Sequence, residues 1–459
     1  MHIITALRAA IALAACVSLA AACLPAPKPQ PFAIAWNYDT SGYLETCGCS
    51  SHQLGGIARR ATKLTELRQQ QDVLAIEGAH FIETSGEFQL FKGETVVRAL
   101  NAMDYSAVVL GAREAQHGAE ALRQLADLAV MPALCANLEV DGKPWDERAT
   151  AVTISGVRVG ITAVTQPEFA SFALPDGVRF TDPRAALDAE LLELKRRSDL
   201  IVVCLEGETT WVHQLAQDYR SQAHLFLSGI RQEPSANLHW EADPPLLNNY
   251  LYGKYMGFVT VDPLPDGYQL AGTTINLDDD IADDAAITQI LDNDYKAQLK
   301  DRFFSTTKVD LTQIYLPPDS CEPCHEEAYA AYAASGHADA MATLHEVDQL
   351  YNPDCMRCHV VYDPQRDELQ AMNCVMCHVN ITDQHIWDAV NNEVQPPAEP
   401  VTAYTFQWCS RCHDDLNSLR FKDAWPQMVN RIYHGGDNSA ALAAAEDMGI
   451  DYFSPPPPK

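Results

Sequence analysis

The chain has 459 residues, a formal net charge of −30 at pH 7 and an apolar fraction of 47%. This length is typical of two or three domains, and the composition indicates globular domains rather than a disordered chain. The strong negative charge argues against a nucleic-acid partner, because phosphates are bound by basic surfaces.

The first 22 residues have the pattern of an export signal. Arg8 precedes an apolar run, residues 9–22, that is too short to span a bilayer. A lipoprotein-type cleavage box ends at Cys23 and predicts a lipid anchor there, with ordinary signal-peptidase cleavage nearby as the alternative. A proline-rich tether, residues 23–31, follows. We therefore expect the mature protein in the periplasm or at the outer membrane of a Gram-negative bacterium, including its cell surface.

Residues 32–277 alternate short apolar runs with amphipathic helical patterns. Six apolar runs predict buried strands: 32–36, 73–76, 107–110, 157–163, 200–203 and 224–227. Three longer patterns predict helices: 57–70, 94–101 and 183–197. Buried strands that alternate with helices indicate a layered α/β domain.

Four short motifs accompany these strands and helices. They are Asp39-Thr-Ser-Gly42, Gly55-Gly56-Ile-Ala-Arg59-Arg60, Gly111-Ala-Arg-Glu114 and Tyr252-Gly-Lys-Tyr-x-Gly257. Their order resembles the catalytic domain of the 5′-nucleotidase and UDP-sugar hydrolase family, which consists of metallophosphoesterases with two metal ions.

By this resemblance, Asp39 is the one metal ligand that is retained. Other residues stand at the remaining ligand positions: Ser41, Ala79, Ala112, Arg113, Ile230 and Gln232. Two cations need several carboxylates and imidazoles to bind them and to activate water. The resemblance therefore implies a metallophosphoesterase-like domain with a degenerate site and no hydrolysis of phosphoesters.

The α/β domain also contains four cysteines. Cys47 and Cys49 form a Cys-Gly-Cys after the first strand, Cys135 follows a strand, and Cys204 is predicted to end another. Because ligands gather at the carboxyl ends of strands, we predict that these thiols face the cleft that corresponds to the family's metal site. Three histidines are candidates to lie nearby: His52, His80 and His117.

Cys47 and Cys49 are the candidate catalytic residues of a thiol redox or soft-metal site. The alternative is that Cys-Gly-Cys is a tight turn and that Cys135 and Cys204 are small, buried apolar residues.

Residues 278–316 are predicted to form a helical linker. A helix over 285–304 has acidic residues before it, basic residues near its end and one apolar stripe. The stripe consists of Ile287, Ile290, Leu291, Tyr295 and Leu299. An apolar stripe must pack on a neighbour, so we expect this helix to join the two halves of the chain.

Residues 317–453 contain four copies of Cys-x-x-Cys-His. The cysteine pairs are Cys321/Cys324, Cys355/Cys358, Cys374/Cys377 and Cys409/Cys412, and the histidines are His325, His359, His378 and His413. Each thiol of a pair forms a thioether with one vinyl group of a haem, and the adjacent histidine ligates the iron. The sequence therefore predicts four covalently bound haem c groups, with a zinc or thiol redox site as the alternative that a single motif would leave open.

Further histidines of this segment are candidate distal ligands: His337, His345, His385 and His434. If all of them bind, every iron is six-coordinate and closed to small molecules, as in electron carriers. Methionines are competing ligands: Met341, Met372, Met376 and Met428. Another alternative is one surface histidine and one open haem, with His345 as the histidine left over.

The spacing of these residues resembles the multihaem c-type cytochromes related to the tetrahaem cytochrome of nitrifiers and to hydroxylamine oxidoreductase. The similarity includes Ser-Gly-His337-Ala after the first motif, the closely spaced second and third motifs, and Trp425 before His434. It implies that His337, His385 and His434 are distal ligands. The usual Gly-Pro-Gly after the third motif is replaced by Val379-Asn380-Ile381.

The favoured function is electron transfer by an extracytoplasmic tetrahaem cytochrome, with redox proteins or extracellular acceptors as partners. The acidic segment 317–459 can steer a basic redox partner, and a proline-rich tail, residues 454–459, ends the chain. Three alternatives stay open. They are a terminal reductase with an inorganic substrate at the Cys-Gly-Cys cleft, a metal-dependent phosphoester hydrolase, and assembly into an oligomer or haem filament.

Overall fold

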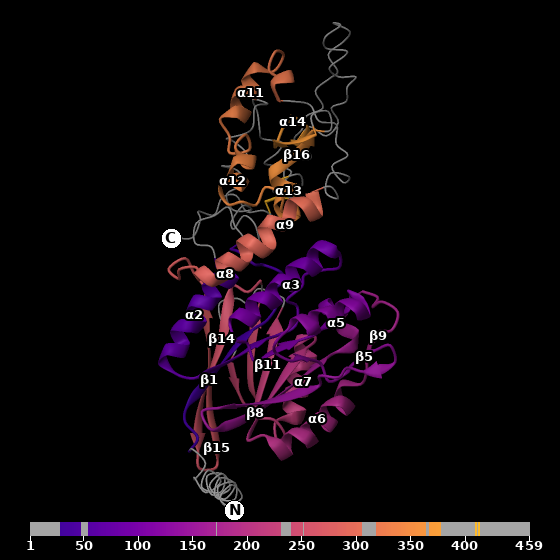
Figure 1. The fold of residues 1–459 in the computed structure, drawn as a ribbon, viewed down its shortest axis with the longest axis vertical. Helices are drawn as coiled ribbons and strands as arrows, with labels where there is room; N and C mark the ends of the chain where they lie inside the picture. Colours follow the sequence, from indigo (N-terminus) through magenta and orange to yellow (C-terminus); the bar gives the residue numbers. More distant parts are fainter. Residues whose placement is uncertain are drawn as a thin grey trace, which may run out of the picture.

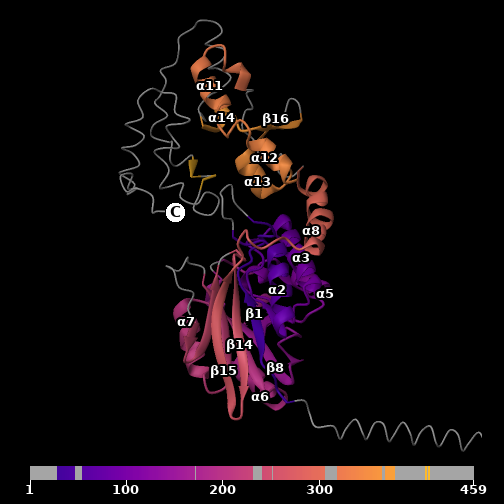
Figure 2. The same ribbon diagram turned by 90° about the vertical axis from the view of Figure 1, so that its left-hand side faces the viewer.

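The structure is a computed structural model. It describes residues 28–46, 54–170, 172–230, 240–250, 252–304, 318–363, 367–377, 409–410 and 412–413. An α/β domain forms the lower part of the molecule in Figure 1, and a smaller C-terminal region, from residue 318 onward, lies above it. A long helix crosses between the two parts (Figures 1 and 2).

Within the described residues, two six-stranded sheets form the centre of the α/β domain. Their strand orders are β15–β14–β1–β2–β3–β4 and β12–β13–β11–β10–β8–β7. The strands of the first sheet are β1 (Phe32–Asn37), β2 (Val73–Glu77), β3 (Ala107–Val109), β4 (Ala133–Leu134), β14 (Tyr255–Leu264) and β15 (Gly267–Asn276). The strands of the second sheet are β7 (Ala149–Ile154), β8 (Val157–Thr165), β10 (Leu200–Glu206), β11 (Leu225–Ile230), β12 (Trp240–Ala242) and β13 (Pro245–Tyr250).

Most neighbouring strands in the middle of each sheet are parallel. The chain pairs β1, β2, β3 and β4 in parallel, and it does the same with β8, β10, β11 and β13. The strands β7, β12, β14 and β15 run antiparallel to their neighbours. The parallel strands therefore bring their carboxyl ends to one end of the domain.

The side chains of β1 show how the layers are packed. Phe32, Ile34 and Trp36 lie in the apolar cluster between the two sheets. Ala33 and Ala35 point to the opposite face and pack against helices. This alternation follows from the two-residue period of a strand, and the small alanines let the helices approach closely.

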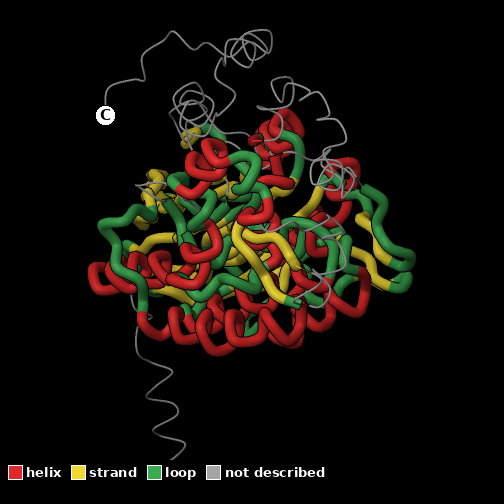
Figure 3. The backbone as a smooth tube through the Cα atoms, turned by 90° about the horizontal axis from the view of Figure 1, so that it is seen from above, coloured by secondary structure: helices red, strands yellow, loops and turns green. Residues whose placement is uncertain are grey.

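Helices cover the outer face of each sheet. Those on the first sheet are α2 (Ile57–Gln70), α3 (Glu87–Ala102), α4 (Ala112–Ala115) and α5 (Gly118–Leu128), and those on the second are α6 (Pro183–Arg197) and α7 (Thr209–Tyr219). From above, a row of helices runs along one side of the strands (Figure 3). The layered α/β prediction is confirmed, and α2 and α6 have the predicted bounds.

Smaller elements complete the domain. They are a three-stranded sheet of β5 (Leu138–Val140), β6 (Lys143–Pro144) and β9 (Val178–Phe180), and the 3-10 turn η1 (Pro167–Phe169).

The connecting helix, residues 285–304, is called the clasp helix below. It consists of α8 (Ala285–Ile290), the π-helical turns η2 (Leu291–Lys296), α9 (Ala297–Leu299) and the π-helical turns η3 (Lys300–Phe304). Its stripe packs into the apolar core beside α3, where Tyr295 and Phe303 stack on Phe91 at 5.6 and 5.4 Å between ring centroids. The predicted packing of this stripe is confirmed.

The C-terminal region consists of short elements. They are η4 (Pro318–Ser320), α11 (Glu326–Ala333), α12 (Ala340–Glu346), α13 (Pro353–His359), β16 (Val360–Asp363), β17 (Glu368–Ala371) and α14 (Cys374–Cys377). Leu344, Met356 and Val360 form its buried cluster in the described residues. In the part of the chain that the structure describes, no helix has the length and apolar character needed to cross a membrane.

Candidate functional site

Several residues predicted to be functional lie outside the described residues, and the predictions for them stay predictions. They are Cys23, Cys47, Cys49, His52, Gln232, His378, His385, Met428 and His434.

The carboxyl ends of the parallel strands hold a cluster of buried ionisable side chains. Asp39 follows β1, Glu77 ends β2 and is followed by His80, Glu114 follows β3, and Glu206 ends β10. All of these side chains are buried. Strand pairing brings them together from distant parts of the sequence.

His80 lies at the centre of this cluster. Its Nε2 is 2.5 Å from Oε1 of Glu206, and its Nδ1 is 3.8 Å from Oδ1 of Asp39. The ring lies between Tyr38 and Phe169, with centroids at 5.5 and 5.7 Å. When it is protonated, this imidazole places a positive charge between two carboxylates. His80 thus connects the strand ends β1 and β10 through Asp39 and Glu206.

Glu206 and Glu114 respond differently to the same surroundings. Burial opposes ionisation of Glu206, but the charge of His80 and donors from Thr165 and the Ala112 amide outweigh it and lower the pKa of Glu206. For Glu114, burial raises the pKa to about 7; His80 opposes this shift and the Glu206 charge reinforces it. The site therefore holds one ionised carboxylate and one that titrates near neutral pH.

A second buried pair lies beside the first. Arg60 Nη1 is 2.7 Å from Oε2 of Glu77, and Arg60 Nη2 donates to Oγ1 of Thr40 at 2.8 Å. Thr40 itself donates to Glu77. Burial raises the pKa of Glu77 despite the charge of Arg60. These contacts join the loop after β1 to α2 and to the end of β2.

The sequence indicates the importance of the strand ends but not of these residues. Glu77 and Glu206 are single carboxylates that close buried apolar runs, and this is the signal that could have identified them. The sequence predicts His80 only as a neighbour of the cleft, whereas the structure places it at the centre of the cluster. His117 lies apart from the cluster, because its Nε2 contacts the carbonyl oxygen of Thr84 at 2.9 Å.

The positions that correspond to metal ligands make other contacts. Ser41 Oγ donates to Asp39 Oδ1 at 2.6 Å, Ala79 lies in the core between the sheets, and Arg113 lies over the ring of Phe172 at 5.2 Å. Among the residues that the structure describes, no group of three or more His, Cys, Asp or Glu side chains is arranged to hold a metal ion. The described side chains at these positions do not by themselves fit a two-metal centre.

The prediction that these thiols face the cleft is wrong for Cys204, whereas Cys135 lies within electrostatic range of Glu206 at the strand ends. Cys204 lies inside β10, two residues before its end, and packs in the core between the sheets. Cys135 follows β4 but is also buried, with Sγ 3.6 Å from Oδ1 of Asn137. Burial raises the pKa of Cys135 to about 12 and raises that of Cys204 strongly. Both therefore stay protonated and act as small apolar residues.

The first Cys-x-x-Cys-His motif lies at the surface of the C-terminal region. Cys321 is half-buried, whereas Cys324 and the adjacent His325, which precedes α11, are exposed. Attachment of haem at Cys324 stays a prediction.

The second Cys-x-x-Cys-His motif lies on α13, and its histidine is oriented by α12. Nδ1 of His359 is 2.9 Å from the carbonyl oxygen of Ala340. A nitrogen that donates to a carbonyl leaves Nε2 with the lone pair, which is the usual arrangement of a metal-bound histidine. The motif thus fits the predicted role of His359 as an iron ligand.

His337 approaches the histidine of the fourth motif. The ring centroids of His337 and His413 are 6.0 Å apart. Two imidazoles bound to opposite sides of one metal ion have centroids about 6 Å apart, because each metal–nitrogen bond is about 2 Å long. His345, by contrast, is exposed in the last turn of α12.

The four motifs meet in two pairs although they are separated in sequence. The Cys321 thiol is hydrogen-bonded with Cys374, and Cys412 with Cys358. The first motif therefore contacts the third, and the second contacts the fourth. Only the backbone of Cys377 is described.

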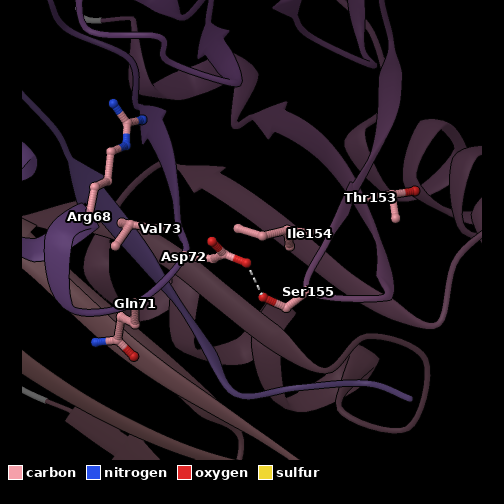
Figure 4. A pocket seen from close by; sticks show the side chains of 7 residues that line it. All are labelled: Arg68, Gln71, Asp72, Val73, Thr153, Ile154 and Ser155. Atoms are coloured by element: carbon pink, nitrogen blue, oxygen red, sulfur yellow. Dashed lines mark hydrogen bonds between the residues drawn. The ribbon is translucent and has the colours of Figure 1, made fainter. Parts of the chain in front are cut away.

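An open hollow lies at the opposite end of the α/β domain, near the amino end of β2 (Figure 4). It is lined by Arg68, Gln71, Asp72, Val73, Thr153, Ile154 and Ser155. The carboxylate of Asp72 in this hollow accepts a hydrogen bond from Ser155 Oγ at 2.5 Å. The hollow is therefore remote from the chemistry of the strand ends.

Comparison with known proteins gives a different result for each half of the chain. The family model "Cytochrome c554 and c-prime" matches residues 320–414. The 5′-nucleotidase of Bos taurus is 25% identical over 337 residues, covering 65% of this chain and 58% of that protein. The 5′-nucleotidase of Homo sapiens is 26% identical over 310 residues, covering 61% and 54%. The chain thus spans little more than half the length of these relatives.

Solved structures show the fold of the N-terminal half. The 5′-nucleotidase precursor of Thermus thermophilus has a TM-score of 0.51 at 17% identity, covering 58% of this chain and 59% of that chain. The sulfate thiohydrolase SoxB of the same organism has a TM-score of 0.51 at 13% identity, covering 66% and 69%. The N-terminal domain therefore has a metallophosphoesterase-like α/β fold, and the helix- and loop-rich C-terminal region matches a cytochrome c family.

Proposed function

We propose that this protein is an extracytoplasmic tetrahaem c-type cytochrome whose task is electron transfer. The observation that carries the proposal is the contact of the first Cys-x-x-Cys-His motif with the third and of the second with the fourth, together with the orientation of His359. The match to a cytochrome c family supports it. Bound haem would supply a one-electron couple at each motif.

The chain's own residues have two tasks in this proposal. The paired cysteines attach each haem, and His325, His359, His378 and His413 ligate the four irons from the side of the motif. His337, His345, His385 and His434 are the proposed ligands on the other side. The 6.0 Å separation of the rings supports a pairing of His337 with His413. Iron with two histidines has no open position, so it exchanges electrons without binding substrate.

A haem-stained gel, a pyridine haemochrome assay and an EPR spectrum of the pure protein test this function. We expect four haems per chain and low-spin signals. Fewer than four haems would contradict the tetrahaem proposal, and a high-spin signal would show an open iron. In that case His345 is the residue left over, because it is exposed on α12.

We further propose that the α/β domain does not hydrolyse phosphoesters. His80 occupies the space between Glu206 and Asp39 where the relatives of this fold would bind cations, and Tyr38 and Phe169 enclose the ring. The expected result is no release of phosphate from nucleotides with added Mn²⁺, Zn²⁺ or Mg²⁺. Metal-dependent release that His80→Ala abolishes would overturn this part.

Attachment to the outer membrane through Cys23 is the proposed location. The support is the lipoprotein-type box and the proline-rich tether that follows it. Globomycin treatment of the expressing cells should accumulate the uncleaved precursor, and the variant Cys23→Ala should no longer incorporate labelled palmitate. A protein that is not labelled by palmitate and matures normally in the presence of globomycin would exclude the anchor. Redox proteins or extracellular acceptors are the proposed partners, and sedimentation would reveal an oligomer or a filament.

A second candidate is a terminal reductase that acts on an inorganic substrate at Cys47 and Cys49. One observation favours this candidate. Glu45 forms an ion pair with Lys296 at 2.7 Å and a hydrogen bond with Gln349. The residues just before Cys47 therefore contact both the clasp helix and the C-terminal region. The double variant Cys47→Ser/Cys49→Ser should abolish turnover with the acceptor and leave the haem spectra intact. Unchanged turnover would contradict the reductase proposal and leave electron transfer as the proposed function.

A further inference from the structure

Lys92 is a buried lysine that connects the two parts of the molecule. It lies on α3 of the α/β domain, and its side chain is 5% exposed. Its Nζ is 2.6 Å from Oδ2 of Asp354 in the C-terminal region. A buried ammonium group needs such a partner, because its charge is costly to remove from water.

The stem of Lys92 is held by the loop that follows β1. Gly42 has a φ of +65°, and a Cβ at this position would lie 2.6 Å from Cε of Lys92. The ammonium group also lies over the rings of Tyr43 and Phe88, at 5.7 and 5.4 Å from their centroids. Lys92 is therefore part of the same loop environment that holds Asp39.

Asp354 belongs to the helix that carries the second haem motif. It is the residue directly before Cys355, and its amide donates a hydrogen bond to the side chain of Asn352, which caps α13. Asn352 also donates to the hydroxyl of Tyr295 on the clasp helix at 3.2 Å. The start of α13 is thus fixed to the α/β domain and to the clasp helix at once.

Other charges near this pair are few among the described residues. Glu83 lies within electrostatic range of both Lys92 and Asp354, and Arg357, inside the second motif, is in range of Glu83. Lys92 and Asp354 neutralise one another at close range. Removal of one partner therefore exposes the second motif to the uncompensated charge of the other.

We propose that Lys92 is a positioning residue that locks the second haem-binding helix onto the rim of the cleft at the strand ends of the α/β domain, and that the charge balance of the Lys92–Asp354 pair keeps the reduction potential of the haem attached to Cys355 and Cys358 at its wild-type value. The inference rests on the proposed tetrahaem function. The inference predicts that, of the four haems, this one has a reduction potential that depends on a residue of the α/β domain.

Coulomb's law gives the direction of each effect. In Lys92→Met, the carboxylate of Asp354 is unpaired beside the motif, so oxidised iron is favoured and the potential falls. In Asp354→Asn, the ammonium of Lys92 is unpaired, so reduced iron is favoured and the potential rises. The double variant Lys92→Met/Asp354→Asn restores neutrality and should return the potential towards that of the wild type.

The test is a spectroelectrochemical titration of the full-length haem-loaded protein and its variants. We expect one of the four redox components to shift, in opposite directions in the two single variants, and to recover in the double variant. Lys92→Arg keeps the charge and should keep the potential. Lys63→Met on α2 removes a lysine paired with Glu66 at 2.7 Å within the same helix, and it should shift nothing.

Three results would overturn the inference. They are four unchanged components in variants that retain four haems, shifts of the same sign in both single variants, and an equal shift of all four components. If Lys92→Met does not fold, the comparison of Asp354→Asn with Lys92→Arg still tests the inference, because both variants keep a positive charge at position 92. A protein without four haems would contradict the proposed function itself. The haem content is therefore measured before any titration.

Discussion

Side chains fill the interior of the α/β domain, whereas α11 of the C-terminal region, described over its full length, buries none of its residues. The described part of the C-terminal region has one apolar cluster around Met356, and part of that cluster comes from Phe304 of the clasp helix. The α/β domain pairs the buried Arg60 with its own Glu77, whereas its buried Lys92 is paired with Asp354 of the C-terminal region. The α/β domain is thus held together by its own apolar side chains, whereas the C-terminal region depends on contacts with the rest of the chain.

Loss of haem should have the largest effect on this contrast. If the protein is produced without cytochrome c maturation, the proposed thioether links to haem cannot form, and the C-terminal region should become sensitive to protease. The α/β domain with its clasp helix should stay resistant, because the clasp packs into the core of that domain. Limited proteolysis with mass spectrometry would show a stable fragment that ends near residue 304. A resistant full-length apoprotein would contradict the comparison.

The buried charges of the α/β domain offer the next largest effect. Arg60→Met leaves Glu77 buried without its partner and should lower the free energy of unfolding by about 3–5 kcal/mol. Urea denaturation of the haem-loaded protein, followed by tryptophan fluorescence, measures this loss. The double variant Arg60→Met/Glu77→Leu removes both charges and should recover much of it. Lys63→Met, at an exposed pair, should cost no more than about 0.5 kcal/mol.

The dependence of stability on pH tests Glu114. Its folded-state pKa of about 7 is raised by burial above the ordinary value of 4.5, so the folded state holds the proton more tightly. This contribution is fully present below about pH 4.5 and is lost as the pH rises through about 7. The loss is about 3 kcal/mol, from 1.36 kcal/mol per pKa unit.

Glu114→Gln should remove this part of the pH dependence. The exposed neighbour variant Glu120→Gln should keep the wild-type profile. Glu206 does not interfere, because its lowered pKa moves its own effect to below pH 4.5, where stability falls as the pH falls. Parallel profiles for Glu114→Gln and the wild type would show that Glu114 is not the titrating group.

Substitution of the buried cysteines should cause the smallest changes in the free energy of unfolding. Cys204→Ala should cost about 1 kcal/mol, and Cys204→Ser about 1–3 kcal/mol, because the hydroxyl enters an apolar core without a partner. In the native protein, Cys135 and Cys204 should resist a thiol reagent such as iodoacetamide, and both should react after denaturation. Rapid native labelling of either residue would show an open site.

Local patterns predicted much of the fold. The helices at 57–70 and 183–197 have the bounds that their apolar periodicity predicts. The haem motifs are also local, because thioether attachment depends on a spacing of three residues. In both cases the determining interactions act within a few residues of the sequence.

The contents of the cleft could not be predicted in the same way. His80, Asp39 and Glu206 meet because β2 pairs with β1 and the two sheets stack, which is a tertiary event. Cys204 shows the limit for strands, since a shift of two residues separates a strand end from a core position. The exposure of Cys324 and the approach of His337 to His413 likewise depend on how the C-terminal region folds.

The clasp helix has a spacing with a mechanical consequence. Ile287, Leu291, Tyr295, Leu299 and Phe303 recur every four residues, and all are buried. In a regular α-helix, positions four apart rotate by about 40° per step, so such a line would wind around the axis. The π-helical turns over Leu291–Lys296 and Lys300–Phe304 hold more residues per turn and bring the average close to four.

The five side chains therefore form a straight rib parallel to the helix axis. Deletion of one residue in the middle of the rib would rotate the end that meets the C-terminal region by roughly 90° relative to the other end. The length of this helix, as much as its composition, thus determines which face of the haem-binding part is turned towards the α/β domain.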